Sequence, residues 1–158
     1  MFQRKIIEQS AFDVLEMARH SAEQHLNTYV TPEHVLFQVE ASGLLLRVLN
    51  DNQMSPFYFR DRLNLFLNSL KSKQPAGDHP IQVADNLRFA IDSAFSFADV
   101  QGENIITVPH LLVGIAGLKD SLAGYLLSNN TEILHGLEWL HRTTNCFGYF
   151  GLAKIQCV

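Results

Sequence analysis

The sequence contains the same short segment twice. TPEHVLFQV at 31–39 is followed by TVPHLLVGI at 107–115, an offset of 76 residues from 31 to 107. A segment that recurs at a fixed period indicates one structural unit used twice. We therefore expect two copies of a small fold, related by an approximate two-fold axis.

The residues before each segment have the apolar period of a helix that is buried along one side. In the first copy this stripe is Ile7, Ala11, Val14, Leu15, Ala18, Ala22 and Leu26. Shifted by the same offset it becomes Leu87, Ala90, Ile91, Ala94 and Ala98. The small residues recur at matched places, which predicts close helix contacts in both copies.

The repeated segment itself is typical of a helix start. Thr31 and Thr107 are the expected N-caps, because a Thr hydroxyl can satisfy a free backbone N–H of the first turn. Pro32 suits the first helical position, and Glu33 suits the positive end of the helix dipole. The apolar run after each Thr predicts that this second helix is mostly buried.

Two further helices complete each unit in the pattern. We expect third helices at 44–52 and 122–130, and fourth helices at 57–70 and 131–142. The predicted fold is therefore all-α, with two tandem four-helix repeats about a pseudo-two-fold axis. The first repeat is expected at 1–72, the linker at 73–80, the second repeat at 81–142 and a tail at 143–158. The tail is left open between a short β-like segment, a docking strand and the start of a further linker.

Composition narrows the classes of function. Apolar residues make up 47% of the chain and charged residues 18%, a globular balance. The net charge is −4 and the basic residues form no run, which disfavours nucleic acid as a partner. Both cysteines, Cys146 and Cys157, lie near the end, and neither a signal peptide nor a membrane-length apolar run is evident. These features predict a cytoplasmic protein with no membrane association.

The duplicated unit resembles the Clp N-terminal domain, the double repeat found before AAA+ unfoldases of the ClpA, ClpB and ClpC kind. The segments 27–39 and 104–115 carry the resemblance, which covers roughly residues 5–142. It implies a non-catalytic, cofactor-free domain that binds an adaptor such as a ClpS-like protein, or unfolded or tagged substrates, in protein quality control and proteolysis. It also implies that a full-length protein forms a hexameric ATP-driven ring, and the sequence leaves open whether such a ring follows residue 158.

The resemblance also bears on individual residues. In the ClpC branch the motif Glu helps to hold the guanidinium of phosphoarginine, and Glu33 takes that place here. The second copy has Pro109 instead, and Glu8 stands where that branch has a Thr. A carboxylate at Glu8 would repel a phosphate, so adaptor or apolar peptide binding is favoured over phosphoarginine.

We expect partner contacts at Glu8, Tyr29, Glu33 and Tyr58, polar and aromatic residues assigned to the surface between the repeats. Among the aromatic residues at 57–59 and Phe66, Tyr58 is the one expected at the surface. The other members are expected in the core.

His34 and His110 are each interpreted as structural, because they occupy the same turn of equivalent helices. The chain shows no G-x-x-x-x-G-K-[ST] phosphate loop and no G-x-S-x-G nucleophile motif. We therefore predict no catalytic residues and no metal site. The alternative function is a stand-alone Clp-repeat protein that serves as a scaffold or regulatory partner of a Clp or secretion-type machine.

Overall fold

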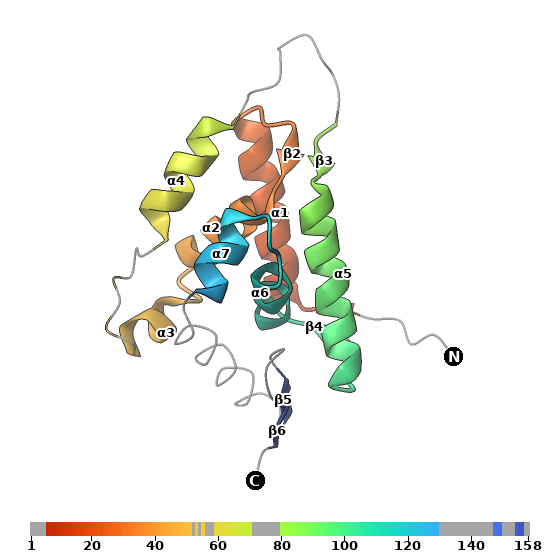
Figure 1. Cartoon of the computed structure of the whole chain (residues 1–158). Coiled ribbons are helices and arrows are strands. Elements are labelled where there is room, and N and C mark those ends of the chain that lie inside the picture. Colours follow the sequence, from red (N-terminus) through yellow and green to blue (C-terminus); the bar gives the residue numbers. More distant parts are fainter. Residues whose placement is uncertain are drawn as a thin grey trace.

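The computed structural model describes residues 6–51, 53, 55, 59–70, 80–129, 147–149 and 154–156, and within them the chain is mainly helical (Figure 1). The first half contains α1 (Gln9–Gln24), α2 (Pro32–Ala41), α3 (Leu46–Asp51) and α4 (Arg60–Ser69). The second contains α5 (Asp85–Val100), α6 (Val108–Ala116) and α7 (Leu122–Ser128). The predicted all-helical, duplicated fold is confirmed. The fourth helix expected at 131–142 and most of the expected linker lie outside the described residues, and the repeat boundaries stay predictions.

Four short strands, which the sequence interpretation missed, join the two repeats. Strand β1 (Ile6–Ile7) precedes α1 and pairs in parallel with β4 (Ile105–Ile106), which precedes α6. Strand β2 (Tyr29–Val30) precedes α2 and pairs in parallel with β3 (Gln82–Val83), which precedes α5. Each pair therefore joins one strand from each repeat. Figure 1 shows the two pairs near opposite ends of α1.

The hydrogen bonds of the two strand pairs obey the same 76-residue shift. At one end the Ile6 N–H donates to the Asn104 carbonyl oxygen at 2.8 Å. At the other end the equivalent bond joins the Gln82 N–H to the Thr28 carbonyl oxygen at 3.2 Å. A second bond at each end, from Glu8 and from Ala84, follows the same rule. A pseudo-two-fold axis between the repeats accounts for this reciprocity.

Small residues let the helices of each repeat approach one another closely. The predicted stripe positions Ala11, Ala18 and Ala22 on α1, and Ala90, Ala94 and Ala98 on α5, are all fully buried or nearly so. On α6, Gly114 lies directly against the backbone of Ala90, so that a Cβ at Gly114 would collide with the Ala90 carbonyl. Larger apolar residues, such as Leu36, Leu112 and Ile115, fill the rest of the core.

The tail forms a short hairpin in the described part. Strands β5 (Phe147–Tyr149) and β6 (Lys154–Gln156) pair antiparallel, with Phe147 opposite Gln156. This agrees with the β-like alternative left open for the tail. Of the aromatic residues in the first repeat, Phe59 is fully buried and Phe66 half-buried, whereas Phe57 and Tyr58 lie outside the described residues. None of the described helices is long and apolar enough to cross a membrane.

The contact between α5 and α6 generates a stability prediction. Gly114→Ala should lower the free energy of unfolding by at least about 1 kcal/mol, because the added methyl group meets backbone that cannot rotate away. Gly117→Ala is the matched control. Gly117 ends the same helix with a φ of −76°, where an alanine methyl would make only ordinary contacts.

Urea denaturation of both variants measures the difference. The control should stay within about 0.5 kcal/mol of the wild type. Equal stability of Gly114→Ala and Gly117→Ala would contradict the close approach of α5 and α6.

Candidate functional site between the repeats

The repeated Thr-x-x-His segment builds a hydrogen-bonded helix start. Thr31 is the N-cap of α2, and its N–H donates to Nδ1 of His34 at 3.1 Å. Because Nδ1 accepts this bond, the hydrogen of the neutral ring lies on Nε2, which donates to Oδ1 of Asn27 at 3.1 Å. His34 is 2% exposed. The ring therefore links the α2 start to the end of the loop after α1.

The second copy repeats this arrangement. The Thr107 N–H, at the N-cap of α6, donates to Nδ1 of His110 at 3.0 Å. Nε2 of His110 lies 2.8 Å from Oε1 of Gln101 and 3.3 Å from Oε2 of Glu103. Both histidines thus occupy the structural position that the sequence analysis favoured. The copies differ in that Nε2 of His110 also lies near a carboxylate, that of Glu103.

Burial controls the protonation of His34. Removal from water lowers the pKa of His34 from 6.5 to about 4, and the negative charge of Glu33 opposes this shift only in part. A proton on Nδ1 would also displace the bond from Thr31. The ring is therefore neutral in the folded chain at neutral pH.

Glu33 is a buried link between the repeats. Its side chain is on the first turn of α2, and the residue is 2% exposed. Oε1 accepts a hydrogen bond from the Ser121 hydroxyl at 3.0 Å and one from the Ala123 N–H at 3.4 Å. Ser121 is the N-cap of α7. The structure thus differs from the predicted surface contact, because Glu33 holds α7 of the other repeat instead of facing solvent.

A second buried carboxylate on α2 serves α4. Oε2 of Glu40 accepts the N–H of Phe59, the N-cap of α4, at 3.0 Å. Its Oε1 lies 3.8 Å from Nε of Arg60. Burial raises the pKa of Glu40, while the bond from Phe59 and the charge of Arg60 oppose the rise. Helix α2 therefore fixes the start of one helix in each repeat.

An apolar pocket of about 210 Å³ opens on the other side of the pseudo-axis. Residues at the start of α1, in the turn before α3 and at the start of α6 line it: Glu8, Ser10, Leu44, Leu45, Val108, Pro109 and Leu112. Leu44 is 42% exposed at this site, and Glu8 is exposed as well. The two repeats therefore share an accessible apolar recess with one carboxylate at its edge.

The two repeats differ at the position that makes the polar link. Pro109 is the equivalent of Glu33 at the 76-residue offset. Glu33 reaches the turn before α7 through Ser121, whereas Pro109 has no side-chain donor or acceptor to offer Leu44 and Leu45 in the turn before α3. The polar link on one side is thus replaced by an apolar recess on the other.

The structure does not gather the predicted contact residues into one site. Glu8 lies at the start of α1 in the pocket, but Tyr29 follows the end of α1, and a helix of that length rises about 24 Å. Tyr29 is 48% exposed on β2, in the other strand pair. Tyr58 lies outside the described residues. Partner contact at Glu8 and Tyr29 stays a prediction.

Sequence reasoning missed the apolar members of the pocket. Leu44 and Leu45 fall in the LLL run after Gly43, which the helical period assigned to the third helix. Leu112 was assigned to the core and is fully buried. A signal was available in the replacement of Glu33 by Pro109 in the second copy. Among the described residues, no group of three or more His, Cys, Asp and Glu side chains is placed to hold a metal ion.

Comparison with known families gives one match. The family model of the Clp repeat (R) N-terminal domain matches residues 7–130. No curated protein matches the sequence.

Solved structures share the fold at low sequence identity. The N-terminal domain of Hsp104 from Candida albicans is 15% identical, with a TM-score of 0.75 over 87% of this chain and 92% of that chain. The N-terminal domain of the ClpV1 ATPase from E. coli EAEC is 22% identical, with a TM-score of 0.67 over 87% of this chain and 86% of that chain. A ClpV N-domain in complex with a VipB peptide is 16% identical, with a TM-score of 0.60 over 80% and 78%. These similarities show the fold.

The neutral, buried His34 should make stability fall in acid. The pKa of His34 is lower in the folded chain than in the unfolded chain, so the unfolded chain binds more protons between pH 6.5 and about 4. The free energy of unfolding should lose about 3 kcal/mol over this window through His34 alone. Urea denaturation of the wild type and of His34→Gln at pH 7, 5.5 and 4 checks this.

His34→Gln should be less stable at pH 7 but should lose less on acidification than the wild type. His20→Gln, which changes an exposed histidine on α1, is the matched control and should keep the wild-type dependence. If the free energy of unfolding of the wild type and of His34→Gln changed with pH in parallel, the lowered pKa of the buried His34 would be refuted.

The link between Glu33 and Ser121 should contribute to stability. Glu33→Ala should lower the free energy of unfolding by about 1 to 3 kcal/mol, because a buried hydroxyl and a backbone N–H lose their acceptor. A double-mutant cycle with Ser121→Ala should give a coupling of at least about 0.5 kcal/mol. Glu23→Ala, which removes an exposed ion pair with Arg19, is the control and should cost less. Additive effects of Glu33→Ala and Ser121→Ala would count against a direct link.

Proposed function

Because the chain belongs to the Clp repeat N-terminal domain family, we propose that it is a non-catalytic binding domain that receives protein segments for a Clp-type ATP-dependent unfoldase. The observation that carries this proposal is the apolar pocket between the repeats. The ring that would use ATP, a hexamer in this proposal, would lie outside the residues of this chain. The setting is cytoplasmic protein quality control and proteolysis.

The pocket suits an apolar side chain of a peptide better than a free small molecule. At about 210 Å³ it lies below the usual volume of small-molecule sites, about 300 to 1,000 Å³. Val108, Pro109 and Leu112 supply an apolar wall, and Leu44 is partly exposed at the same recess. An apolar anchor residue buried there would supply most of the binding energy of a short segment.

Glu8 determines which charge is favoured in the segment that the pocket would accept. Its exposed carboxylate would attract a Lys or Arg next to the apolar anchor, and would repel a phosphate. Glu33, the residue that the family resemblance relates to phosphoarginine binding, is buried and already bonded to Ser121. Both features support an adaptor or an apolar peptide, such as a ClpS-like protein or a segment of an unfolded or tagged substrate, as the partner.

A second candidate function is a stand-alone Clp-repeat protein that holds one fixed partner in a secretion-type machine. The fold similarity to ClpV N-domains favours it, including the one solved with a VipB peptide. The two candidates differ in what stays bound. An unfoldase domain should retain several unfolded clients or an adaptor, whereas a scaffold should retain one partner in equal amount.

Replacing Leu44 tests the pocket. The probe is fluorescein-labelled, reduced and carboxymethylated α-lactalbumin, an unfolded protein, and its binding is followed by fluorescence anisotropy. Leu44→Asp should weaken binding at least about fivefold, because it places a charge where the apolar anchor would lie. Leu46→Asp is the matched control, since Leu46 is similarly exposed at 44%, against 42% for Leu44, but does not line the pocket.

Affinity capture from lysate with the wild type and both variants separates the candidates. Loss of clients with Leu44→Asp supports the unfoldase domain, and loss of one stoichiometric partner supports the scaffold. Equal effects of the two substitutions would exclude the pocket as the binding site. A wild-type chain that holds neither clients nor a stoichiometric partner would contradict both functions.

A further inference from the structure

The pocket between the repeats contains one charged residue whose side chain has no role inside the described structure. Glu8 is the only charged residue in the described lining, and it is exposed. The ion pairs among the described residues do not include Glu8. Although Glu8 is the N-cap of α1, its side chain makes no hydrogen bond to the helix start. A full negative charge is therefore available at the edge of an apolar recess.

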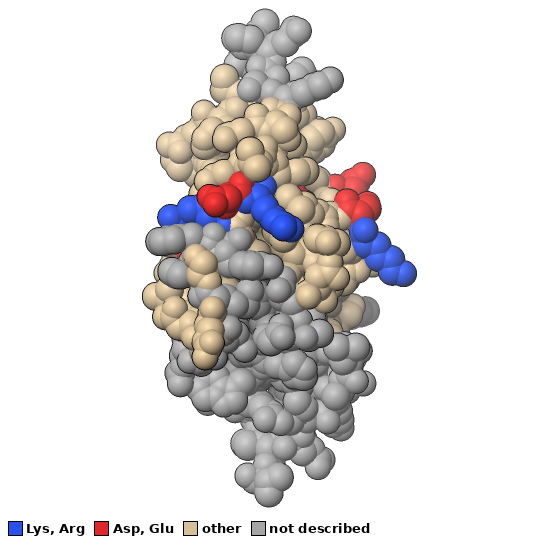
Figure 2. All heavy atoms as spheres, turned by 60° about the vertical axis from the view of Figure 1, so that its left-hand side comes forward, with Lys and Arg blue, Asp and Glu red and all other residues tan. Residues whose placement is uncertain are grey.

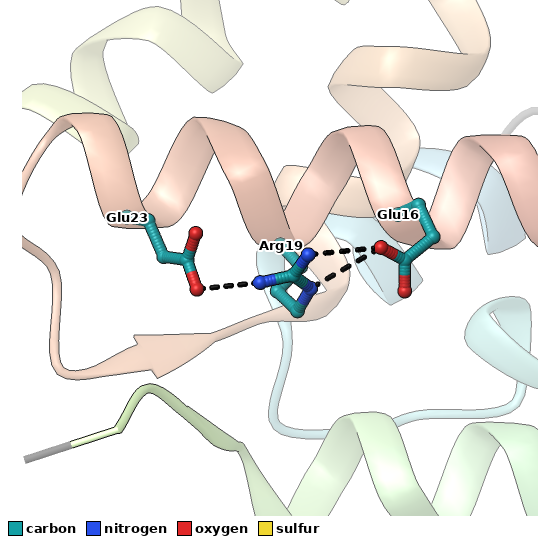
Figure 3. Close-up of polar contacts among 3 residues, drawn as sticks. All are labelled: Glu16, Arg19 and Glu23. Carbon is teal, nitrogen blue, oxygen red and sulfur yellow. Dashed lines mark hydrogen bonds and ion pairs between the residues drawn. The ribbon is translucent and has the colours of Figure 1, made fainter.

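Carboxylates further along α1 are engaged. Glu16 and Glu23 both form ion pairs with Arg19, which stands between them (Figure 3). On the face shown in Figure 2, acidic and basic side chains likewise lie beside one another. Within the part of the chain that the structure describes, Glu8 has no such partner. Its charge is thus left for a ligand.

The second repeat shows that the backbone does not require a carboxylate at this position. Ala84 is the equivalent of Glu8 at the 76-residue offset and is the N-cap of α5. The Glu8 N–H donates to the Ile106 carbonyl oxygen at 2.8 Å. The Ala84 N–H makes the equivalent bond to the Val30 carbonyl oxygen at 2.9 Å. An alanine therefore suffices for the strand pair and the helix start.

The recess has room for one residue of a bound segment. A compact space of about 210 Å³ is about 7 Å across, roughly twice the 3.8 Å between consecutive Cα atoms. Val108, Pro109 and Leu112, with Leu44 opposite in the sequence of the other repeat, supply its apolar surface. Ser10 adds a hydroxyl that can donate to a carbonyl oxygen. Apolar, anionic and hydrogen-bonding groups are thus within reach of a single residue.

The amino-terminal residue of a protein presents the three groups that match this lining. On one Cα it carries its side chain, an α-ammonium cation and the first carbonyl group. The partial positive charge at the starts of α1 and α6 suits that carbonyl oxygen, and Glu8 remains the one full charge of the lining.

An internal apolar residue matches the lining less well. It has one neutral N–H in place of the ammonium, so that a neighbouring Lys or Arg must supply the positive charge. That charge lies at the end of a long side chain, which loses rotamer freedom when it is held at Glu8. The α-ammonium is bonded directly to the Cα of the anchored residue and has no such cost.

We propose that the pocket recognises the free amino terminus of a partner protein whose first residue is large and apolar, such as Leu or Phe. The first side chain fills the recess, the α-ammonium pairs with Glu8, and the first carbonyl oxygen accepts from the Ser10 hydroxyl. This inference rests on the proposed function, because it names the class of segment that the same pocket binds. An internal apolar anchor beside a Lys or Arg is the alternative that the experiment distinguishes.

The probes are short peptides of Gly and Ser that contain one Leu and carry fluorescein at the carboxyl end. The first begins with Leu and has a free amino terminus, and the second is the same peptide acetylated on that Leu. The third is acetylated and has an internal Leu followed by Lys. Fluorescence anisotropy with the wild-type chain at up to about 1 mM should show the free peptide binding at least about tenfold more tightly than either acetylated one.

Glu8→Gln should bring the free and acetylated Leu peptides to within about twofold of each other, because only the free peptide loses a charge partner. Asp92→Asn is the matched control. It makes the same change at an exposed carboxylate of α5 outside the pocket, and should keep the wild-type difference.

The pH dependence of binding identifies the cation. The affinity for the free Leu peptide should fall at least about fivefold between about pH 7 and about pH 9, because an α-amino group loses its proton near about pH 8, whereas Lys does so near about pH 10.4. The acetylated Leu peptide should show no such fall.

Four results would overturn the inference: no binding of the free peptide at about 1 mM, equal affinity of the free and acetylated Leu peptides, a difference that Glu8→Gln leaves unchanged, or tighter binding of the internal Leu–Lys peptide. The last result would assign the pocket to internal segments. Binding of unfolded α-lactalbumin that Leu44→Asp abolishes would show, in each case, that the proposed function stands and only the preference for a free amino terminus has failed.

Discussion

The reciprocal exchange of strands is the constraint on which the rest of the structure depends. Each repeat contributes one short strand to its partner at either end of α1, and the hydrogen bonds match under the 76-residue shift. Two-residue strands are weak by themselves. Their effect here is geometric, because they fix where α2 and α6 begin relative to the opposite repeat. The shared pocket, the link from Glu33 and the outward orientation of α5 all follow from that placement.

Within this symmetric frame, the functional features arise where the copies differ. Glu33 gives one side a buried polar contact with Ser121, and Pro109 leaves the equivalent place on the other side as an apolar recess. Arg19 forms ion pairs with Glu16 and Glu23 on α1, whereas Phe95, at the same position of α5, packs against the core. A duplication keeps the buried positions because they pack against each other. Surface positions are free of that requirement and can acquire separate binding roles.

The buried histidines show which polar residues a sequence can place correctly. The same turn in both repeats was enough to interpret His34 and His110 as structural, because a ring at a helix start can accept from its own N-cap. Glu33 shares that turn, yet its partner is 88 residues away, and local spacing carries no information about it. A first-turn carboxylate looks equally suited to solvent and to a buried contact. Its actual environment depends on the neighbouring repeat.

The sequence by itself determined the class of the fold, the duplication, the buried stripes of α1 and α5 and the helix starts at Thr31 and Thr107, because these follow from local spacing and backbone capping. Only the tertiary structure decided the strand exchange, the burial of Glu33, the separation of Glu8 from Tyr29 and the place of the pocket. Strands of two residues leave no periodic signal, and contacts between repeats depend on how the two units dock. That docking is set by long-range packing that no short segment encodes.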